Sequence, residues 1–180
     1  MDKKTQIIEV ATQLFSERGF ENTPLSLICE TAKVSKGLIF HHFKSKNHLL
    51  REIFSKTTTT IVEINNNQQI SPTPQEKILE LIERFFRQLK ADKMIFQLNL
   101  NMILQPNTRE ILNDLIQERS SFLLHSVKSI FDEIDYKNSM IMTYLFIAEL
   151  DGIALNYLCI FEEYPLSQIK TQLINKYTSK

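Results

Sequence analysis

The sequence is poor in the residues that interrupt secondary structure or build special chemistry. Its 180 residues include three glycines, five prolines, two cysteines and no tryptophan. So few turn formers argue against a turn-rich β-protein. The glycines, Gly19, Gly37 and Gly152, are isolated, which excludes a glycine-rich phosphate loop. Cys29 and Cys159 lie far apart and form no CxxC pair, so without an apolar signal segment we expect free thiols in a reducing compartment.

The same absences weigh against an enzyme or a metalloprotein. There is no HExxH motif, and no histidine lies three residues after a glutamate, as a helical di-iron site requires. His41 and His42 are adjacent and would point about 100° apart on a helix, so they could bind a metal only with ligands from elsewhere. We therefore expect no catalytic residue, no metal site and no cofactor.

What the sequence has in abundance is helical periodicity. Hydrophobic residues make up 43% of the chain and charged residues 23%, which suits a soluble protein with a substantial core. Ile78, Ile82, Phe85 and Leu89 illustrate the i, i+3, i+4 spacing that recurs along the chain. We predict an all-α fold of about nine helices, with a polar linker at 65–74.

Positive charge is concentrated in one part of a chain whose net charge is zero. Residues 1–56 contain nine Lys or Arg against six Asp or Glu, a net charge of +3. Residues 33–56 contain six basic residues against one acidic residue, a net charge of +5. A basic patch on a neutral protein indicates a polyanion site at one end of the molecule, although a solvated surface is the alternative.

This basic stretch follows a pattern of helix, short break and second short helix. Thr23 is the expected N-cap and Pro24 the first residue of the first helix, and Ser35 is the expected N-cap of the second. Ser45 can cap the helix that follows. Such an arrangement is typical of a helix-turn-helix, whose second helix enters the DNA major groove. Gly37 costs about 1 kcal/mol in a helix. Its lack of a side chain would let the backbone approach DNA closely.

The stretch "VSKGLIFHHFKSKNHLL" resembles the signature of TetR/AcrR-type transcriptional regulators. Upstream residues follow the same pattern: Ala11, Leu14, Phe15, Gly19, Phe20, Thr23 and Ile28. The resemblance implies a dimeric repressor of a palindromic operator, with a small-molecule effector. It also implies dimerisation through the C-terminal helices at about 139–178, where "ELDGIAL" looks like the penultimate helix of the family.

Carried over position by position, the resemblance supplies the DNA-contacting candidates: Ser35, Lys36, Gly37, Leu38, Phe40, His41, His42 and Lys46. Three positions depart from the family pattern. Lys33 stands at the turn glycine, Phe40 at a tyrosine, and Pro24 at a hydroxyl residue. Lys33 would be strained if this position keeps a positive φ.

The resemblance further implies two domains, with alternatives that stay open. Residues 1–56 would form the DNA-binding domain, with the helix-turn-helix at about 25–44. Residues 57–74 would end the connecting helix and form the linker, and 75–180 would bind effector and dimerise. Candidates for the effector pocket are Phe85, Met102, Phe122, His125, Tyr144 and Asp151, although most aromatic residues could simply be core. The alternative function is a helical adaptor that does not bind DNA.

Residues 139–161 are apolar nearly all round and long enough to span a membrane. Glu149 and Asp151 lie at the middle, where each would cost about 2.5–3.5 kcal/mol in a bilayer. We therefore expect a helix buried on two sides, one of them by a second subunit, and a cytoplasmic protein without a membrane partner.

Overall fold

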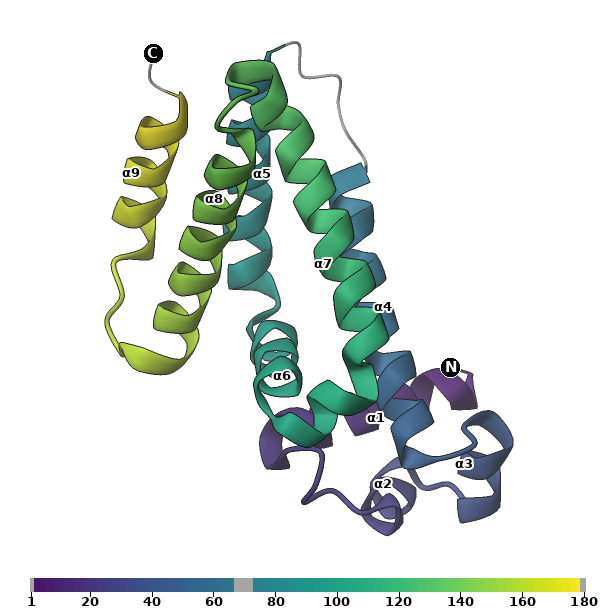
Figure 1. Cartoon of the computed structure of the whole chain (residues 1–180). Helices are drawn as coiled ribbons and strands as arrows, with labels where there is room; N and C mark the ends of the chain where they lie inside the picture. The colour runs from purple at the N-terminus through teal and green to yellow at the C-terminus, as the bar shows by residue number, and fades with distance from the viewer. Residues whose placement is uncertain (1, 67–72, 179–180) are drawn as a thin grey trace. The chain divides into compact units, whose positions relative to one another are not determined.

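The structure, a computed structural model, describes residues 2–66 and 73–178, without the side chains of 59–66. Within these residues the fold is entirely helical, as predicted, and contains nine α-helices and one π-helical turn (Figure 1). The elements in chain order are α1 (Lys3–Arg18), α2 (Leu25–Ala32), α3 (Lys36–His42), α4 (Lys46–Asn66), α5 (Pro74–Ala91), α6 (Lys93–Leu104), α7 (Pro106–Ile134), α8 (Ser139–Leu155), η1 (Asn156–Ile160) and α9 (Leu166–Thr178).

The helices form two compact units that do not follow chain order. The first unit comprises Met1–Thr60 and Met94–Gln117, and the second comprises Ile61–Lys93 and Glu118–Lys180. The predicted linker at 65–74 falls largely on 67–72, outside the described residues. The predicted boundaries between functional domains, at residues 56 and 74, stay a prediction. The two units are defined by packing alone, and packing assigns α6 and the start of α7 to the first unit.

The core of the first unit is built on large side chains from α1 to α4. Phe15, Phe43 and Phe54 are at most 1% exposed, and Phe15 packs edge-on against Phe20 with ring centroids 5.2 Å apart. Each such side chain contributes about 1.5–3 kcal/mol through its burial. The aromatic residues therefore fix the short helices α2 and α3, which could not be stable alone.

Thr23 differs from its predicted role. Pro24, not Thr23, is the N-cap of α2, which begins at Leu25. The hydroxyl of Thr23 is buried and donates to the carbonyls of Gly19 (2.8 Å) and Leu14 (3.3 Å). Thr23 therefore joins the connecting loop to the end of α1 because a buried hydroxyl needs an acceptor.

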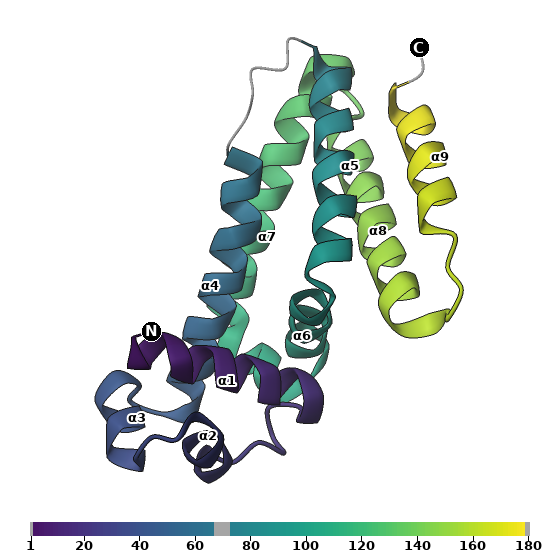
Figure 2. The same ribbon diagram turned by 180° about the vertical axis from the view of Figure 1, so that it is seen from behind.

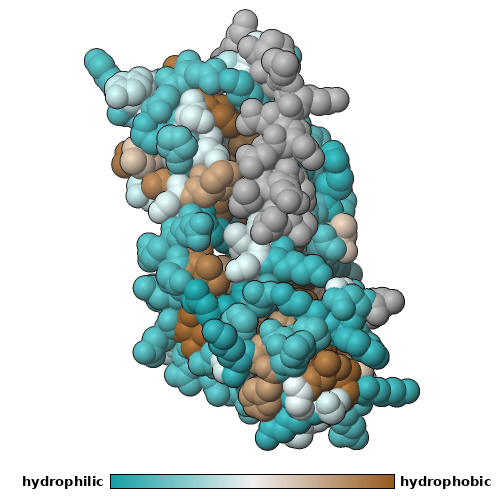
Figure 3. Space-filling view, turned by 90° about the vertical axis from the view of Figure 1, so that its right-hand side faces the viewer, coloured by the Kyte–Doolittle hydropathy of each residue, from teal (hydrophilic) through white to brown (hydrophobic). Residues whose placement is uncertain are grey.

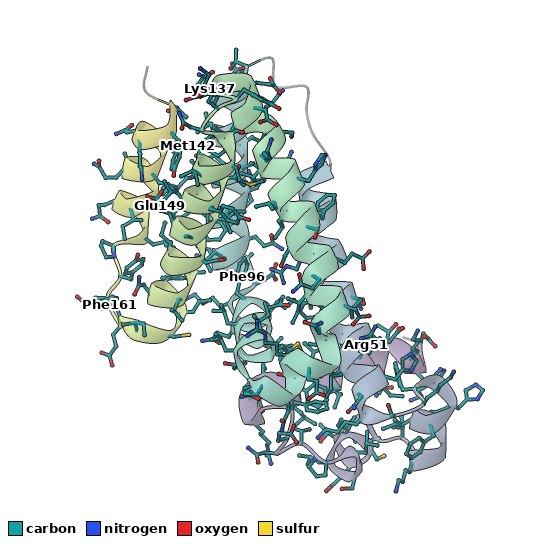
Figure 4. All side chains as sticks on the ribbon, viewed as in Figure 1. Arg51, Phe96, Lys137, Met142, Glu149 and Phe161 are labelled. Carbon is teal, nitrogen blue, oxygen red and sulfur yellow. The ribbon has the colours of Figure 1, made fainter. Side chains whose placement is uncertain are left out.

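In the second unit α5, α8 and α9 run side by side (Figures 1 and 2). An aromatic cluster of Phe131, Phe146 and Tyr177 joins α7, α8 and α9, with centroids 5.0–6.0 Å apart. Glu149 on α8 accepts a hydrogen bond from the hydroxyl of Tyr177 (2.9 Å) and forms an ion pair with Lys176 (Figure 4). Burial, followed by the Glu149 hydrogen bond and charge, raises the pKa of Tyr177.

The predicted helix at 139–161 is present but changes its winding before it ends. α8 gives way at Asn156 to the π-helical turn η1, where the N–H of Phe161 donates to the carbonyl of Asn156 (3.1 Å). By length and composition alone, Ser139–Ile160 could cross a membrane. On the face drawn in Figure 3, hydrophobic residues are exposed in small separate areas among hydrophilic ones.

Candidate nucleic-acid interface

The segment from α2 to α3 has the geometry of a helix-turn-helix. The predicted N-cap of α3 is confirmed, because Ser35 Oγ accepts a hydrogen bond from the N–H of Leu38 (3.2 Å). Ile39 in α3 and Phe43 just after it are fully buried. These two anchors hold a seven-residue helix against the first unit and leave its opposite face exposed.

The turn between the helices depends on a left-handed residue. Lys33 has φ 51° and ψ 50°, and among the described residues other than glycine no other φ is positive. This conformation lets the N–H of Lys33 donate to Glu30 (3.1 Å) and the N–H of Val34 donate to Cys29 (3.0 Å). The positive φ on which the expectation of strain at Lys33 depended is therefore present, and the left-handed region costs an L-residue about 1–2 kcal/mol.

The predicted DNA-contacting residues of α3 lie around its exposed side. Ser35, Lys36, Gly37, Phe40 and His41 are exposed, whereas Leu38 and His42 are half-buried. With about 100° per residue, Gly37 and His41 point about 160° from the buried Ile39. Gly37 and His41 thus form the outermost ridge of the helix.

Lys46 is only partly available. Its Nζ lies 4.2 Å from the ring centroid of Phe20. Burial lowers the pKa of the Lys46 ammonium, and the charge of Glu21 partly opposes that shift. Lys36, by contrast, is exposed, with its Nζ 5.8 Å from the ring centroid of Phe40. The two lysines therefore differ in how freely they could reach a phosphate.

Two reciprocal hydrogen bonds stabilise the start of α4. The predicted cap is confirmed, because the N–H of His48 donates to Ser45 Oγ (3.0 Å). In return, His48 Nδ1 accepts from the N–H of Lys44 (3.2 Å). His48 is therefore engaged in the chain itself, and this arrangement fixes the short connection between α3 and α4.

Arg51 has a positional role that the sequence does not reveal. Its guanidinium donates two hydrogen bonds of 2.6 Å to the carboxylate of Asp114 and one of 2.8 Å to the carbonyl of Ile111, both on α7 (Figure 4). The bidentate hydrogen bond, more than any other cause, lowers the pKa of Asp114 to about 2. Arg51, nine residues after the end of α3, thus joins α4 to α7, and its charge is already paired. No local pattern could predict a partner 63 residues away.

The predicted effector residues belong to both units of the structure. Met102 is buried in the core of the first unit, while the others lie in the second unit. There Phe85 and Phe122 are half-buried, and His125, Tyr144 and Asp151 are exposed. Arg119, which the sequence did not single out, interacts electrostatically with Asp151. Desolvation chiefly raises the pKa of Asp151 and lowers that of Arg119, and their mutual attraction opposes both shifts.

A groove of about 470 Å³ lies in the second unit between the end of α8 and α9. Gly152, Ile153, Asn156, Ile169 and Leu173 contribute to its lining. A Cβ added at Gly152 would meet no atom within 4 Å. The chain itself therefore does not require glycine there, but an approaching helix could. Within the described part of the chain, no cluster of three His, Cys, Asp or Glu could hold a metal ion.

Comparison with known proteins agrees with this geometry. The family model for bacterial regulatory proteins of the tetR family matches residues 7–53. The fatty acid metabolism regulator protein of Bacillus subtilis (strain 168) is 27% identical over 134 residues, covering 71% of this chain and 69% of that protein. An uncharacterized HTH-type transcriptional regulator of the same organism, YhgD, is 29% identical over 132 residues, covering 72% and 67%.

Solved structures extend the likeness to nearly the whole chain. A transcriptional regulator from Aquifex aeolicus VF5 superposes with a TM-score of 0.74 at 26% identity, over 97% of both chains. The regulator FadR from Bacillus subtilis, solved in complex with stearoyl-CoA, superposes with a TM-score of 0.78 at 20% identity, again over 97% of both chains. The second likeness concerns the fold alone.

Proposed function

Since the chain belongs to the TetR/AcrR family of transcriptional regulators, we propose that this DNA-binding regulator is a dimeric repressor. Its operator would be palindromic, and the binding of a small molecule would release the protein from that operator. The observation that carries the proposal is the exposed outer side of α3, held in place by the buried Ile39 and Phe43. The proposed DNA contacts are Ser35, Lys36, Gly37, Leu38, Phe40, His41, His42 and Lys46.

A gel-shift assay across salt concentrations tests the DNA face. Replacing Lys36 by Ala should weaken binding to every duplex by a similar factor, because phosphate contacts are independent of sequence. Lys90→Ala, which removes an exposed lysine from α5, is the matched control and should leave affinity unchanged. Equal effects of the two substitutions would refute the assignment. A helical adaptor would retain no duplex even at low salt.

We infer that the partner at α8 is a second copy of this chain. Ile141, Leu145 and Leu155 are 38–62% exposed and lie along one side of α8, beside the groove at Gly152. A membrane is the other environment for so apolar a helix, but Glu149 is already paired with Lys176 and Tyr177 on α9. A self-associating face is consistent with the proposed cytoplasmic location and with a two-fold operator.

Sedimentation tests the dimer. Leu145→Glu should convert the dimer to monomer, because it places a carboxylate in the apolar contact. Leu104→Glu changes a leucine on α6 in the first unit that is even more exposed, 67% against 52% for Leu145, and should remain dimeric. A Leu145→Glu protein that sediments as the wild type would exclude this surface.

For the effector we propose a long-chain fatty acyl compound. The support comes from the names of two relatives, the fatty acid metabolism regulator and the FadR complex with stearoyl-CoA. Phe85, Phe122 and Tyr144 would contact the acyl chain, and His125 and Asp151 would meet polar groups of the ligand. The role of Met102, which is buried in the core of the first unit, stays a prediction. A ligand at one hundred times its Kd should stabilise the protein by about 2.7 kcal/mol. Thermal unfolding with stearoyl-CoA, stearate or coenzyme A alone distinguishes binding of the acyl chain from binding of the head group. An unchanged unfolding temperature with both stearoyl-CoA and stearate would reject fatty acyl effectors, and the proposal of DNA binding would be unaffected.

A further inference from the structure

The outer side of α3 is short of the side chains that usually read bases by paired hydrogen bonds. Its sequence, KGLIFHH, contains no Arg, Asn, Gln, Asp or Glu. Those residues make most of the bidentate contacts that distinguish one base pair from another in the major groove. Lys36 remains, but it lies at the first residue of the helix and leans over the ring of Phe40. The ability of α3 to discriminate by hydrogen bonding is therefore limited.

Apolar side chains flank the outermost ridge instead. Leu38 and Phe40 stand on either side of the direction that Gly37 and His41 define, each about 80° from it. Phe40 is 44% exposed, a large apolar surface on a helix of seven residues. A single exposed phenylalanine needs no explanation by itself. Phe40, however, lies beside the ridge and Leu38 lies on the other side of it, so the two apolar side chains flank the part of α3 that would be nearest to DNA.

Gly37 determines how near these apolar groups can come to a base pair. A Cβ added at Gly37 would meet only Ser35 Oγ, at 3.9 Å, so the fold leaves room for a side chain there. Without that side chain the backbone of α3 can approach the floor of the groove. A close approach brings the short side chain of Leu38 and the ring of Phe40 into reach of the base edges.

We propose that α3 reads its operator chiefly through the 5-methyl groups of thymine, which contact Leu38 and Phe40. The thymine methyl is the one apolar group that the major groove presents, so it is the natural complement of these side chains. This inference rests on the proposed placement of α3 in the major groove. It makes Leu38 and Phe40 the residues that determine specificity, while Lys36 and Lys46 contribute affinity without sequence preference.

Deoxyuridine tests the proposal directly, because it removes only the methyl group and keeps every hydrogen bond of the base pair. Duplexes that the full-length wild-type protein retains at low salt are selected from a random pool, and each thymine of the selected site is replaced singly. Fluorescence anisotropy should show affinity falling about fourfold for each contacted methyl, the value expected for one buried CH₂ group. One or two thymines in each half-site should respond.

Variants on the same helix separate this mode of reading from general damage. Leu38→Ala and Phe40→Ala should each abolish the preference for thymine over uracil at one position. His41→Ala, the matched control on the ridge, should keep the preference even if it weakens binding. The idea is overturned if the wild type binds uracil and thymine duplexes equally at every position, or if both alanine variants retain the preference. If the protein retains no duplex at all, the proposed binding of α3 in the major groove is refuted, and the thymine proposal with it.

Discussion

Lys33 gives the most direct test of the backbone geometry on which the helix-turn-helix depends. Its φ of 51° and ψ of 50° place it in the left-handed region, and its side chain is exposed. Replacing Lys33 by Gly relieves about 1–2 kcal/mol of strain. The substitution also adds about 0.4–1 kcal/mol of chain entropy to the unfolded state. The net expectation is a gain of about 0.5–1 kcal/mol in the free energy of unfolding, measured by urea titration in the absence of DNA.

Lys44→Gly is the matched control for this prediction. Lys44 is also exposed, lies eleven residues further along the sequence, and has no positive φ. The same chemical change there brings only the entropic penalty, so the protein should lose about 0.4–1 kcal/mol. Lys33→Asn should lie between the wild type and Lys33→Gly, because asparagine tolerates the left-handed region. Stability changes of the same sign in Lys33→Gly and Lys44→Gly would refute the assignment of strain to the turn.

Two further predictions concern Gly37 and Asp114. Gly37→Ala should raise the free energy of unfolding by about 0.5–1 kcal/mol, because alanine has the better helix propensity. The same variant should bind duplexes more weakly in anisotropy assays, and unchanged affinity would contradict a close approach of the α3 backbone to DNA. Asp114 has a folded pKa of about 2, below its ordinary value of 3.8, so its stabilising effect is present above pH 3.8 and is lost as the pH falls through 2. Urea midpoints between pH 5 and pH 2 should therefore fall more steeply for the wild type than for Asp114→Asn, and parallel curves would argue against the ion pair with Arg51.

The features that the sequence predicted well are those that neighbouring residues determine. The caps at Ser35 and Ser45 follow from a hydroxyl placed three residues before an N–H, and both are present. The inner face of α5 follows from helical spacing, and Ile78, Ile82 and Leu89 are buried as expected. Local hydrogen bonding and hydrophobic periodicity contain enough information for both.

The features that escaped prediction depend on residues far apart in the sequence. Arg51 counted only as one more positive charge until its partner on α7 was known. In the sequence Glu149 stood out only as a charge in an apolar helix, and its partner Tyr177 lies 28 residues away. The grouping of α6 and the start of α7 with the DNA-binding helices likewise arises from packing, which no spacing rule encodes.

The positive charge of residues 33–56 that is available to a ligand such as DNA is smaller than the sequence alone indicates. Of the six basic residues in 33–56, Arg51 is neutralised by Asp114, Lys46 is partly buried over Phe20, and Lys56 already interacts within the chain. Within the described residues, Lys33, Lys36 and Lys44 form no ion pair. Each chain therefore has these three lysines and part of Lys46 available for the proposed phosphate contacts.

A dimer that uses those lysines would make about six to eight phosphate contacts, so the logarithm of its affinity should fall with the logarithm of salt concentration at a slope of about −5 to −7. Anisotropy titrations at several salt concentrations measure this slope. A slope near −10 would mean that Arg51 or other cations leave their partners on binding. A slope near −2 would mean that α3 meets the duplex through its apolar groups almost without phosphate contacts, and the basic patch would then lose its proposed role.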